Sequence, residues 1–385
     1  MEKKYTIEDD EITIRTVQYS DLEKLKAFFI IAYGESTVFQ NEKFLLYYFK
    51  TIDQSKAPLS YSLVGVTLNG EIVSHYGGLQ YKLKLKNKII YVIWGVNAFT
   101  LPEWRGKGIN SKMVRYVHEY NEANAVIGMP VEAPFFYEKF GYNFFNKETL
   151  NRFIYTLDHK AFDIAFNIGN NHKRVKRILK IKDAANLKFD SGKIVKLTKN
   201  NLEDYNFNFD IDDDLIATTY RDIHFLKWRL FENIFIKYNV FGYLNNNSIV
   251  SYIVNREETL IPLNYKINRI IDIFGNKEGV INLLNYTLDY SLSNGSIYID
   301  FSMHGKQYEK ELITVGFDKL ENDDVCILPM VTSPIESRPN HEFIGIQSKF
   351  HNDEIHKLTT ENVYFTRIDS DRDRIARITQ INDEL

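Results

Sequence analysis

The sequence lacks the features on which secreted and membrane-spanning proteins depend. Its 385 residues include a single cysteine, Cys326, so the chain can form no internal disulfide and holds no cysteine-rich zinc module. The stretch up to Arg15 has no apolar segment of the kind found in secretion signals, and the longest apolar runs are too short to cross a bilayer. We therefore expect a cytoplasmic protein without membrane insertion.

Neither sign of charge is in excess. Lysine and arginine number 48 and aspartate and glutamate 51, which gives a net charge of −3. Such a chain has no overall basic field to hold nucleic acid, so no nucleic-acid partner is expected. Hydrophobic residues make up 44% of the sequence, which is enough for a sizeable core and excludes a disordered chain.

The first part of the chain is predicted to alternate between strands and helices. Tyr19-Ser20-Asp21 offers caps for a helix that ends near Gly34, and Asn69-Gly70 is typical of a two-residue hairpin turn between two strands. The run 88–100 is apolar on both faces, which predicts a central strand. The other expected elements are strands at 12–17, 125–130 and within 142–157, and helices at 41–51, 109–124 and 131–141.

The second half repeats this order of elements. Between about 157 and 195 the composition turns polar and basic, which indicates a domain boundary. The repetition predicts a duplicated, mixed α/β unit. The charged run DSDRDR (369–374) is expected to be a solvated end. The expected division is a first domain at 1–157, a linker at 158–194, a second domain at 195–335 and a C-terminal segment at 336–385 that packs on the second domain.

The strongest functional signal is the segment Arg105-Gly106-Lys107-Gly108-Ile109-Asn110, which follows an apolar strand and opens an amphipathic helix. Its two glycines let the backbone turn with the N–H groups pointing inward, which forms an anion-binding nest. The helix N-terminus, Arg105 and Lys107 add positive charge. The segment is therefore predicted to bind a pyrophosphate, although its spacing matches no Walker or dinucleotide-binding loop. The alternative is a surface turn with two basic residues.

A second signal is the run FFYEKFGY, Phe135 to Tyr142, which predicts a short helix that ends at a glycine and leads into a strand. Together with the glycine loop, the region 12–157 resembles the GNAT superfamily of acetyl-CoA-dependent N-acyltransferases. The family's pyrophosphate motif ends in glycine or alanine, whereas this chain has Asn110. The resemblance implies a mixed, mostly antiparallel sheet flanked by helices.

The resemblance also implies the ligands and their sites. Acetyl-CoA would be the co-substrate, and its pantetheine arm would lie along the backbone of Phe99, Thr100 and Leu101. Tyr137 would protonate the leaving thiolate, and backbone N–H groups after Val96 would stabilise the oxyanion. The acceptor would be the amine of a small molecule, and the chain could form an oligomer of identical subunits.

Acyl transfer to an amine needs a base, because alkyl amines with a pKa of ~10 are protonated at neutral pH. Many GNAT members place a glutamate on the central strand, but 89–100 contains no carboxylate. The candidates are His75, Glu132 and the terminal carboxylate of Leu385. His75 and Glu132 can equally be ordinary structural residues. The sequence shows no pattern of metal ligands, so no metal cofactor is expected.

The second half resembles a degenerate GNAT copy. Its junction at 275–279 lacks the arginine and the glycine spacing, so no CoA is expected there. The segments 221–229 and YFTRIDSDRDR resemble tandem acetyltransferase-like proteins of bacterial surface-polysaccharide synthesis, which would make the acceptor an amino sugar. A sibling resemblance, to enhanced-intracellular-survival acetyltransferases, would imply an aminoglycoside or polyamine acceptor. The rival hypothesis is a CoA-binding protein without catalysis.

Overall fold

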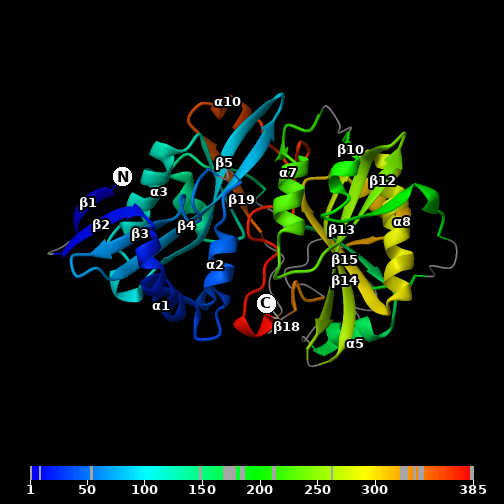
Figure 1. Ribbon diagram of the computed structural model, residues 1–385, viewed down its shortest axis with the longest axis horizontal. Helices are drawn as coiled ribbons and strands as arrows, with labels where there is room; N and C mark the ends of the chain where they lie inside the picture. The colour runs from blue at the N-terminus through cyan, green and yellow to red at the C-terminus, as the bar shows by residue number, and fades with distance from the viewer. Residues whose placement is uncertain are drawn as a thin grey trace.

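The computed structural model describes residues 2–7, 10–52, 55–146, 150–167, 179–182, 187–209, 214–261, 263–320, 328–332, 335–336 and 342–381. Cys326 and Leu385, both considered above, lie outside these ranges. The chain forms two lobes that lie side by side, and the C-terminal segment, orange to red, runs between them (Figure 1).

The first lobe is built on a twisted sheet flanked by helices. In spatial order its strands are β1 (Glu2–Ile7), β2 (Asp10–Thr16), β3 (Leu63–Thr67), β4 (Ile72–Leu85), β5 (Lys88–Thr100), β6 (Ala123–Ile127), β19 (Ile344–Ser348) and β7 (Asn143–Asn146). Its helices are α1 (Leu22–Tyr33), α2 (Glu42–Tyr48), α3 (Ile109–Tyr120), α4 (Ala133–Glu138) and α10 (Asn352–Ile355). The predicted strands and helices of this region are confirmed as elements, but the helices are shorter, at 42–48, 109–120 and 133–138, and the strand expected at 125–130 lies at 123–127.

The second lobe follows the same plan. In spatial order its strands are β9 (Ile194–Leu197), β12 (Asn239–Asn245), β13 (Ser248–Leu260), β14 (Tyr265–Gly275), β15 (Ser296–His304), β8 (Asn151–Thr156) and β16 (Asp318–Leu320). Its helices are α5 (Lys160–Asn167), α7 (Ile223–Leu226), α8 (Lys277–Ser293) and α9 (Glu309–Val315). The short strands are β10 (Asn206–Phe207), β11 (Ala217–Thr219), β17 (Val331–Thr332), β18 (Ile335–Glu336) and β20 (Val363–Thr366).

The two lobes share their strand topology. In each, a hairpin is followed by an antiparallel strand and then by a helix that leads back to a parallel strand, giving β3–β4–β5–α3–β6 and β12–β13–β14–α8–β15. The helix is needed because parallel neighbours cannot be joined by a tight turn. The Asn246-Asn247 turn has positive φ at both residues, as hairpins with two-residue loops require.

The lobes exchange their last strands. β8 follows the first repeat but pairs with β15 and β16 of the second lobe. β19 follows the second repeat but pairs with β6 and β7 of the first. The expected division placed residues up to 157 in the first domain and packed the C-terminal segment on the second. The strand pairing differs on both points, because β8 belongs to the sheet of the second lobe and β19 to that of the first. Adjacency in sequence misled the prediction, because both strands cross to the other lobe.

The hydrophobic core is continuous between the lobes. Ring pairs from the two halves stand at centroid distances of 5.1 Å for Phe44–Phe235 and 5.3 Å for Tyr81–Trp228. β20 joins in from the C-terminal segment, where Phe365 stands 5.7 Å from Trp94. The lobes therefore share one core across their boundary.

Strand exchange predicts that damage at β19 destabilises the whole molecule. A Cβ atom on Gly345 would stand 2.6 Å from the ring of Phe144, so we expect Gly345→Ala to lower the free energy of unfolding by about 1–3 kcal/mol. Urea denaturation should still show one transition, shifted to lower urea. Gly192→Ala, whose Cβ would stand 3.4 Å from the nearest carboxylate oxygen, is the control. Two separate transitions, or no shift, would contradict the shared core.

Candidate functional site

A wedge opens in the first sheet where β5 and β6 separate. Their parallel pairing runs from Val92↔Ala123 only to Gly95↔Val126. Asn97 has a φ of +49°, and β5 carries one more residue than β4 across this point, which is the mark of a β-bulge. Beyond Gly95 the edge of β5 that faces β6 has no strand partner among the described residues. Its backbone groups on that side are open to a ligand.

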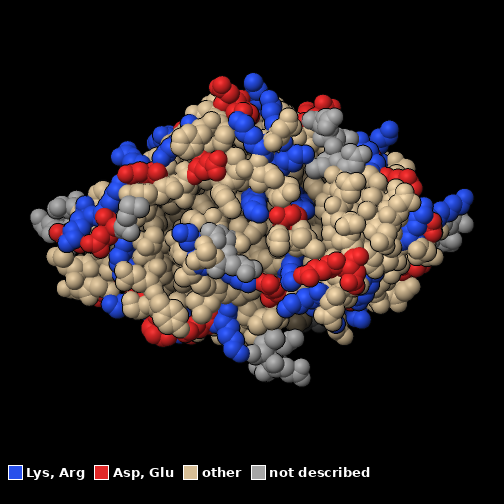
Figure 2. Space-filling model, turned by 45° about the horizontal axis from the view of Figure 1, so that its top comes forward, with Lys and Arg blue, Asp and Glu red and all other residues tan. Residues whose placement is uncertain are grey.

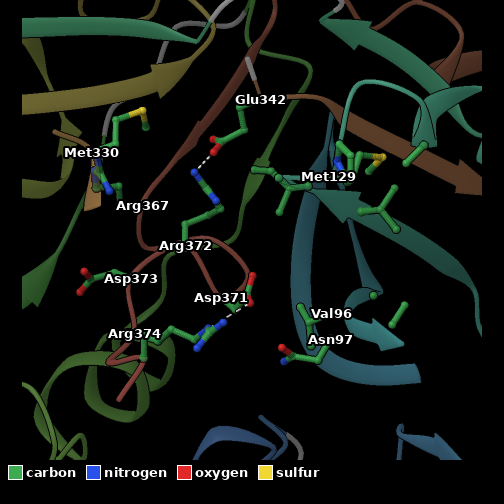
Figure 3. Close-up of a pocket in the computed structure, with 18 of the residues that line it drawn as sticks. Val96, Asn97, Met129, Met330, Glu342, Arg367, Asp371, Arg372, Asp373 and Arg374 are labelled. Atoms are coloured by element: carbon green, nitrogen blue, oxygen red, sulfur yellow. Dashed lines mark hydrogen bonds and ion pairs between the residues drawn. The ribbon is translucent and has the colours of Figure 1, made fainter. Parts of the chain in front are cut away.

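A cavity of about 880 Å³ occupies the wedge and extends between the lobes. On one side it is lined by Gly95–Ala98 of β5, Val126–Val131 of β6 and the loop after it, and Phe136 and Tyr137 of α4. On the other side lie β13, β14 and the C-terminal segment, with many charged side chains (Figure 3). A cavity of this size holds a small molecule and part of a cofactor. Over the face seen in Figure 2, acidic and basic side chains are interspersed.

The glycine loop has the backbone conformation expected of an anion nest. Gly106 and Gly108 both have a φ of +78°, and α3 begins directly after them at Ile109. Within the described chain no side chain caps the first turn of α3, so the first N–H groups of this helix have no capping side chain. Asn110, in that turn, lines the cavity. The glycine loop therefore leads to the wedge through Asn110 at the start of α3.

The loop's basic residues are arranged around the end of β5. The Nε atom of Arg105 donates to the carbonyl of Thr100 at 3.0 Å, and its guanidinium covers the ring of Phe99 at 5.0 Å. Lys107 lies 4.9 Å from the ring of Trp104. These contacts hold two cations beside the nest without burying them.

The predicted pantetheine residues lie just beyond the cavity. Ser74 donates to the carbonyl of Phe99 at 3.1 Å, and the amide of Leu101 donates to Val73 at 3.0 Å. Phe99, Thr100 and Leu101 do not line the cavity. The part of β5 that lines it is Gly95–Ala98. The part of β5 that faces the cavity thus lies nearer the bulge than the sequence indicated.

Tyr137 lies on the cavity wall. It is 8% exposed, and burial raises its pKa to about 12, with the neighbouring Tyr76 hydroxyl opposing the shift. The Tyr76 hydroxyl in turn occupies the space that a side chain at position 95 would need, so Gly95 is required there. At neutral pH the phenol of Tyr137 is protonated and can donate a proton.

His75 is buried away from the cavity. Its ring stands 4.9 Å from Phe29 and 5.7 Å from Phe49, and Nδ1 is 3.0 Å from the carbonyl of Asn97. Burial lowers its pKa to about 4. Its observed contact is with the bulge, and it does not reach the cavity.

Of the other two candidates for the base, the one that the structure describes, Glu132, is not in the cavity lining either. Glu132 is exposed directly before α4, while its neighbours Val131 and Ala133 line the cavity. The carboxylate of Leu385 lies outside the described residues. The structure therefore brings Tyr137 and Asn110 to the cavity and leaves Glu132 and His75 outside it.

The charged run DSDRDR is buried or half-buried between the lobes, and the expectation that it forms a solvated end is wrong. Asp369, Ser370 and Asp373 are at most 3% exposed. Arg221 pairs with Asp369 at 3.3 Å, and Arg256 with Asp373 at 2.6 Å. The alternation of acids and arginines was the available signal, because such a run can be buried once its charges are paired.

β20 fills the equivalent wedge of the second lobe. β14 and β15 pair only as far as Ile270↔Phe301, and beyond that point β20 pairs with β15 through Met303↔Thr366. The Thr366 hydroxyl donates to Asp272 of β14 at 2.8 Å. The start of α8 is likewise occupied, because Asn276 accepts from the amide of Gly279 at 2.8 Å. The position that corresponds to the first wedge is therefore filled by the protein itself.

Comparisons with known proteins agree with this geometry. Residues 13–145 match the acetyltransferase (GNAT) domain family. A GCN5-related N-acetyltransferase from Kribbella flavida has the same fold with a TM-score of 0.51 at 11% identity, over 88% of this chain and 71% of that one. A probable N-acyltransferase from Enterococcus faecalis gives 0.54 at 12% identity, over 88% and 72%.

A third structural relative is the Saccharomyces cerevisiae N-myristoyltransferase, in a structure with bound myristoyl-CoA. It gives a TM-score of 0.52 at 8% identity, over 94% of this chain and 90% of that one. No curated protein sequence matches the chain significantly. Residues 13–145 thus match the GNAT acetyltransferase domain family, within a fold that these relatives share over both lobes.

Two further features concern membranes and metals. Within the described ranges, no helix combines the length and apolar character needed to cross a bilayer. The same residues contain no group of three or more histidine, cysteine or acidic side chains placed to hold a metal ion.

The loop geometry predicts the effect of adding a methyl group. Nothing would contact a Cβ atom at Gly106, so Gly106→Ala strains only the left-handed backbone, and we expect CoA binding to weaken about tenfold as the nest opens. Gly295→Ala is a matched control, because Gly295 has a φ of +74° and equal free space in the second lobe. Titration calorimetry of CoA binding is the measurement, and the parent should bind one CoA per chain. An equal loss of CoA affinity in Gly106→Ala and Gly295→Ala would contradict a CoA site at the glycine loop.

Burial of His75 predicts a pH-dependent stability. Its pKa is about 4 in the folded chain against 6.5 in the unfolded one, so the unfolded chain takes up the proton first as the pH falls. Stability is then lost from about pH 6.5 towards pH 4, by up to ~1.4 kcal/mol per pH unit. Between pH 7.5 and pH 5, the melting temperature of His75→Phe should fall by less than that of the parent protein. Exposed His159→Phe is the control, and equal losses in all three proteins would contradict the argument.

Proposed function

We propose that this protein is a CoA-dependent N-acyltransferase that moves an acetyl group to the amine of a small molecule. One observation carries the proposal: the open edge of β5, Tyr137 and Asn110, which lies in the helical turn directly after the glycine loop, line a single cavity. A diphosphate at the nest and a thioester at the bulge would lie at opposite ends of one extended ligand. The GNAT domain at 13–145 supports acyl transfer as the class of reaction.

The reaction needs three groups at the bulge. The amine nitrogen attacks the thioester carbonyl, a C–N bond forms, and the oxyanion of the intermediate accepts from backbone N–H groups near Val96 and Asn97. As the intermediate collapses, the C–S bond breaks and the thiolate takes the proton of Tyr137. Holding both substrates in line contributes much of the remaining acceleration.

The proton of the attacking amine must go to a base, and we assign that role to Asp371. It lines the cavity, and its Oδ2 accepts from the Tyr48 hydroxyl at 3.0 Å, which in turn accepts from the Asn97 side chain at 3.0 Å. This chain of hydrogen bonds ties Asp371 to the bulge. Its Oδ1 has no hydrogen-bond partner in the described part of the chain and is available to an ammonium group. In Figure 3, Asp371 lies across from Val96 and Asn97.

The remaining details belong to the proposal as well. An amino sugar as acceptor rests only on the resemblance of the C-terminal segment. The competing acceptors are aminoglycosides and polyamines, and the competing function is CoA binding without chemistry. The proposal also includes a cytoplasmic location and an oligomer of identical subunits.

Single substitutions separate these functions. Because each changes one proton-transferring group, Tyr137→Phe and Asp371→Asn should lower kcat by about 10²–10³-fold while leaving CoA affinity within about threefold. Release of CoA from acetyl-CoA in the presence of an amine mixture is the measurement. Asp353→Asn changes an exposed acid on α10 and is the control. Normal turnover in both active-site variants would refute the assigned roles, and CoA binding with no turnover in the parent would favour the binding protein.

A further inference from the structure

The wall of the cavity opposite β5 is rich in arginine. The described lining residues include five arginines against four carboxylates; the arginines are Arg256, Arg269, Arg367, Arg372 and Arg374, and the acids are Glu258, Glu342, Asp371 and Asp373. Most of them come from β13, β14 and the C-terminal segment. Figure 3 shows the arginines of the C-terminal segment facing the cavity from the side opposite Val96 and Asn97.

Four of the five arginines are hydrogen-bonded to a carboxylate. The pairs are Arg256–Asp373 at 2.6 Å, Arg269–Asp300 at 2.9 Å, Arg374–Asp371 at 3.3 Å, and Arg372–Glu342. Paired in this way, each guanidinium has a local counter-charge. The pairing also leaves few unpaired acids for a polycationic ligand.

Arg367 is the exception. Its residue is 6% exposed, and Nε and Nη2 are buried with no hydrogen-bond partner in the described chain. Asp300, the nearest carboxylate, is 3.8 Å from Nη2 and already accepts from Arg152 at 2.9 Å and from Arg269. Burial, together with the charge of Arg269, lowers the pKa of Arg367 to about 10. The group stays charged at neutral pH, yet it shares its one ion-pair partner among the described residues, Asp300, with two other arginines.

A buried guanidinium edge without a hydrogen-bond partner is costly, and proteins rarely keep one unless a ligand completes it. Nε and Nη2 form the edge of the guanidinium that binds the two oxygens of a carboxylate or phosphate side by side. No hydrogen bond holds this edge in place. An oxyanion that enters the cavity can therefore draw it outward by rotation about the side-chain bonds.

Resting on the proposed function, we propose that the acyl acceptor is an amine that also carries an oxyanion, a carboxylate or a phosphate, bound by Arg367. The anion would lie on the arginine-rich wall, and the amine would lie across the cavity between Asp371 and the β5 bulge. A cavity of about 880 Å³ accommodates such a molecule beside the acyl end of CoA. Polyamines and aminoglycosides lack the anion and would meet an excess of arginine.

The test compares acceptors that differ only in the anion. Glycine and glycinamide form the carboxylate pair, glucosamine 6-phosphate and glucosamine form the phosphate pair, and spermidine represents polycations. We expect kcat/KM to be at least tenfold higher for the anionic member of one pair. That pair identifies the anion as carboxylate or phosphate. A preference for neutral amines or spermidine overturns the proposal.

The role of Arg367 is tested by two variants. Arg367→Gln removes the charge, and Arg367→Lys keeps the charge but loses the two-pronged geometry. In both variants the preference for the anionic acceptor should fall because KM for that acceptor rises. The fall should be at least tenfold in Arg367→Gln and smaller in Arg367→Lys. Arg377→Gln, an exposed arginine of the same segment, is the control and should keep the full preference. An undiminished preference in Arg367→Gln overturns the proposal.

A binding measurement separates failure of the anion site from failure of the proposed function. Sodium phosphate and sodium succinate, compared with sodium chloride at equal ionic strength, should raise the melting temperature of the parent but not of Arg367→Gln. If no amine is acetylated while this difference persists, the anion site is supported and the transferase assignment fails. If amines are acetylated but neither anion stabilises the parent, the anion site is refuted and the transferase assignment stands.

Discussion

The structure depends on a reciprocal exchange of strands between its two repeats. β8 completes the sheet of the second lobe and β19 completes that of the first, so each sheet contains a strand that the other half of the chain provides. The exchange also brings the C-terminal segment between the lobes, where it carries Arg367, Asp371 and Asp373 to the cavity. The site is therefore composite: the first lobe supplies the wedge and the glycine nest, and the second repeat with the C-terminal segment supplies the opposite wall.

The two repeats show how one topology gives two different outcomes. In both, the parallel strands separate after a few pairs and a helix starts close by. In the first lobe the separation stays open because β5 bulges at Asn97. In the second, β20 takes up the space, where the Tyr364 hydroxyl donates to the carbonyl of Ile273 and the Thr366 hydroxyl donates to the carboxylate of Asp272. The difference lies in where the C-terminal segment runs, and mere loss of glycines in the second junction does not account for it.

Much of the first lobe could be predicted from sequence because its signals are local. The Asn69-Gly70 turn, the apolar run of β5 and the glycines before α3 each act over a few residues. The exchange of β8 and β19 could not be predicted, because strand partners far apart in sequence leave no periodic signal. His75 was misleading for a related reason: its side chain lies against an aromatic cluster that only the packed sheet, α1 and α2 create. The buried acids Asp369 and Asp373 look like part of a solvated run until their partners Arg221 and Arg256 are known.

The position of β19 and β20 near the end of the chain has a consequence for biosynthesis. The first sheet has a gap between β6 and β7 until residues 344–348 have left the ribosome. During most of translation the nascent first lobe therefore exposes two unpaired strand edges, which are prone to associate with other chains. Chaperones that shield strand edges should matter more for this protein than for a single-domain acetyltransferase, whose last strand emerges soon after the others.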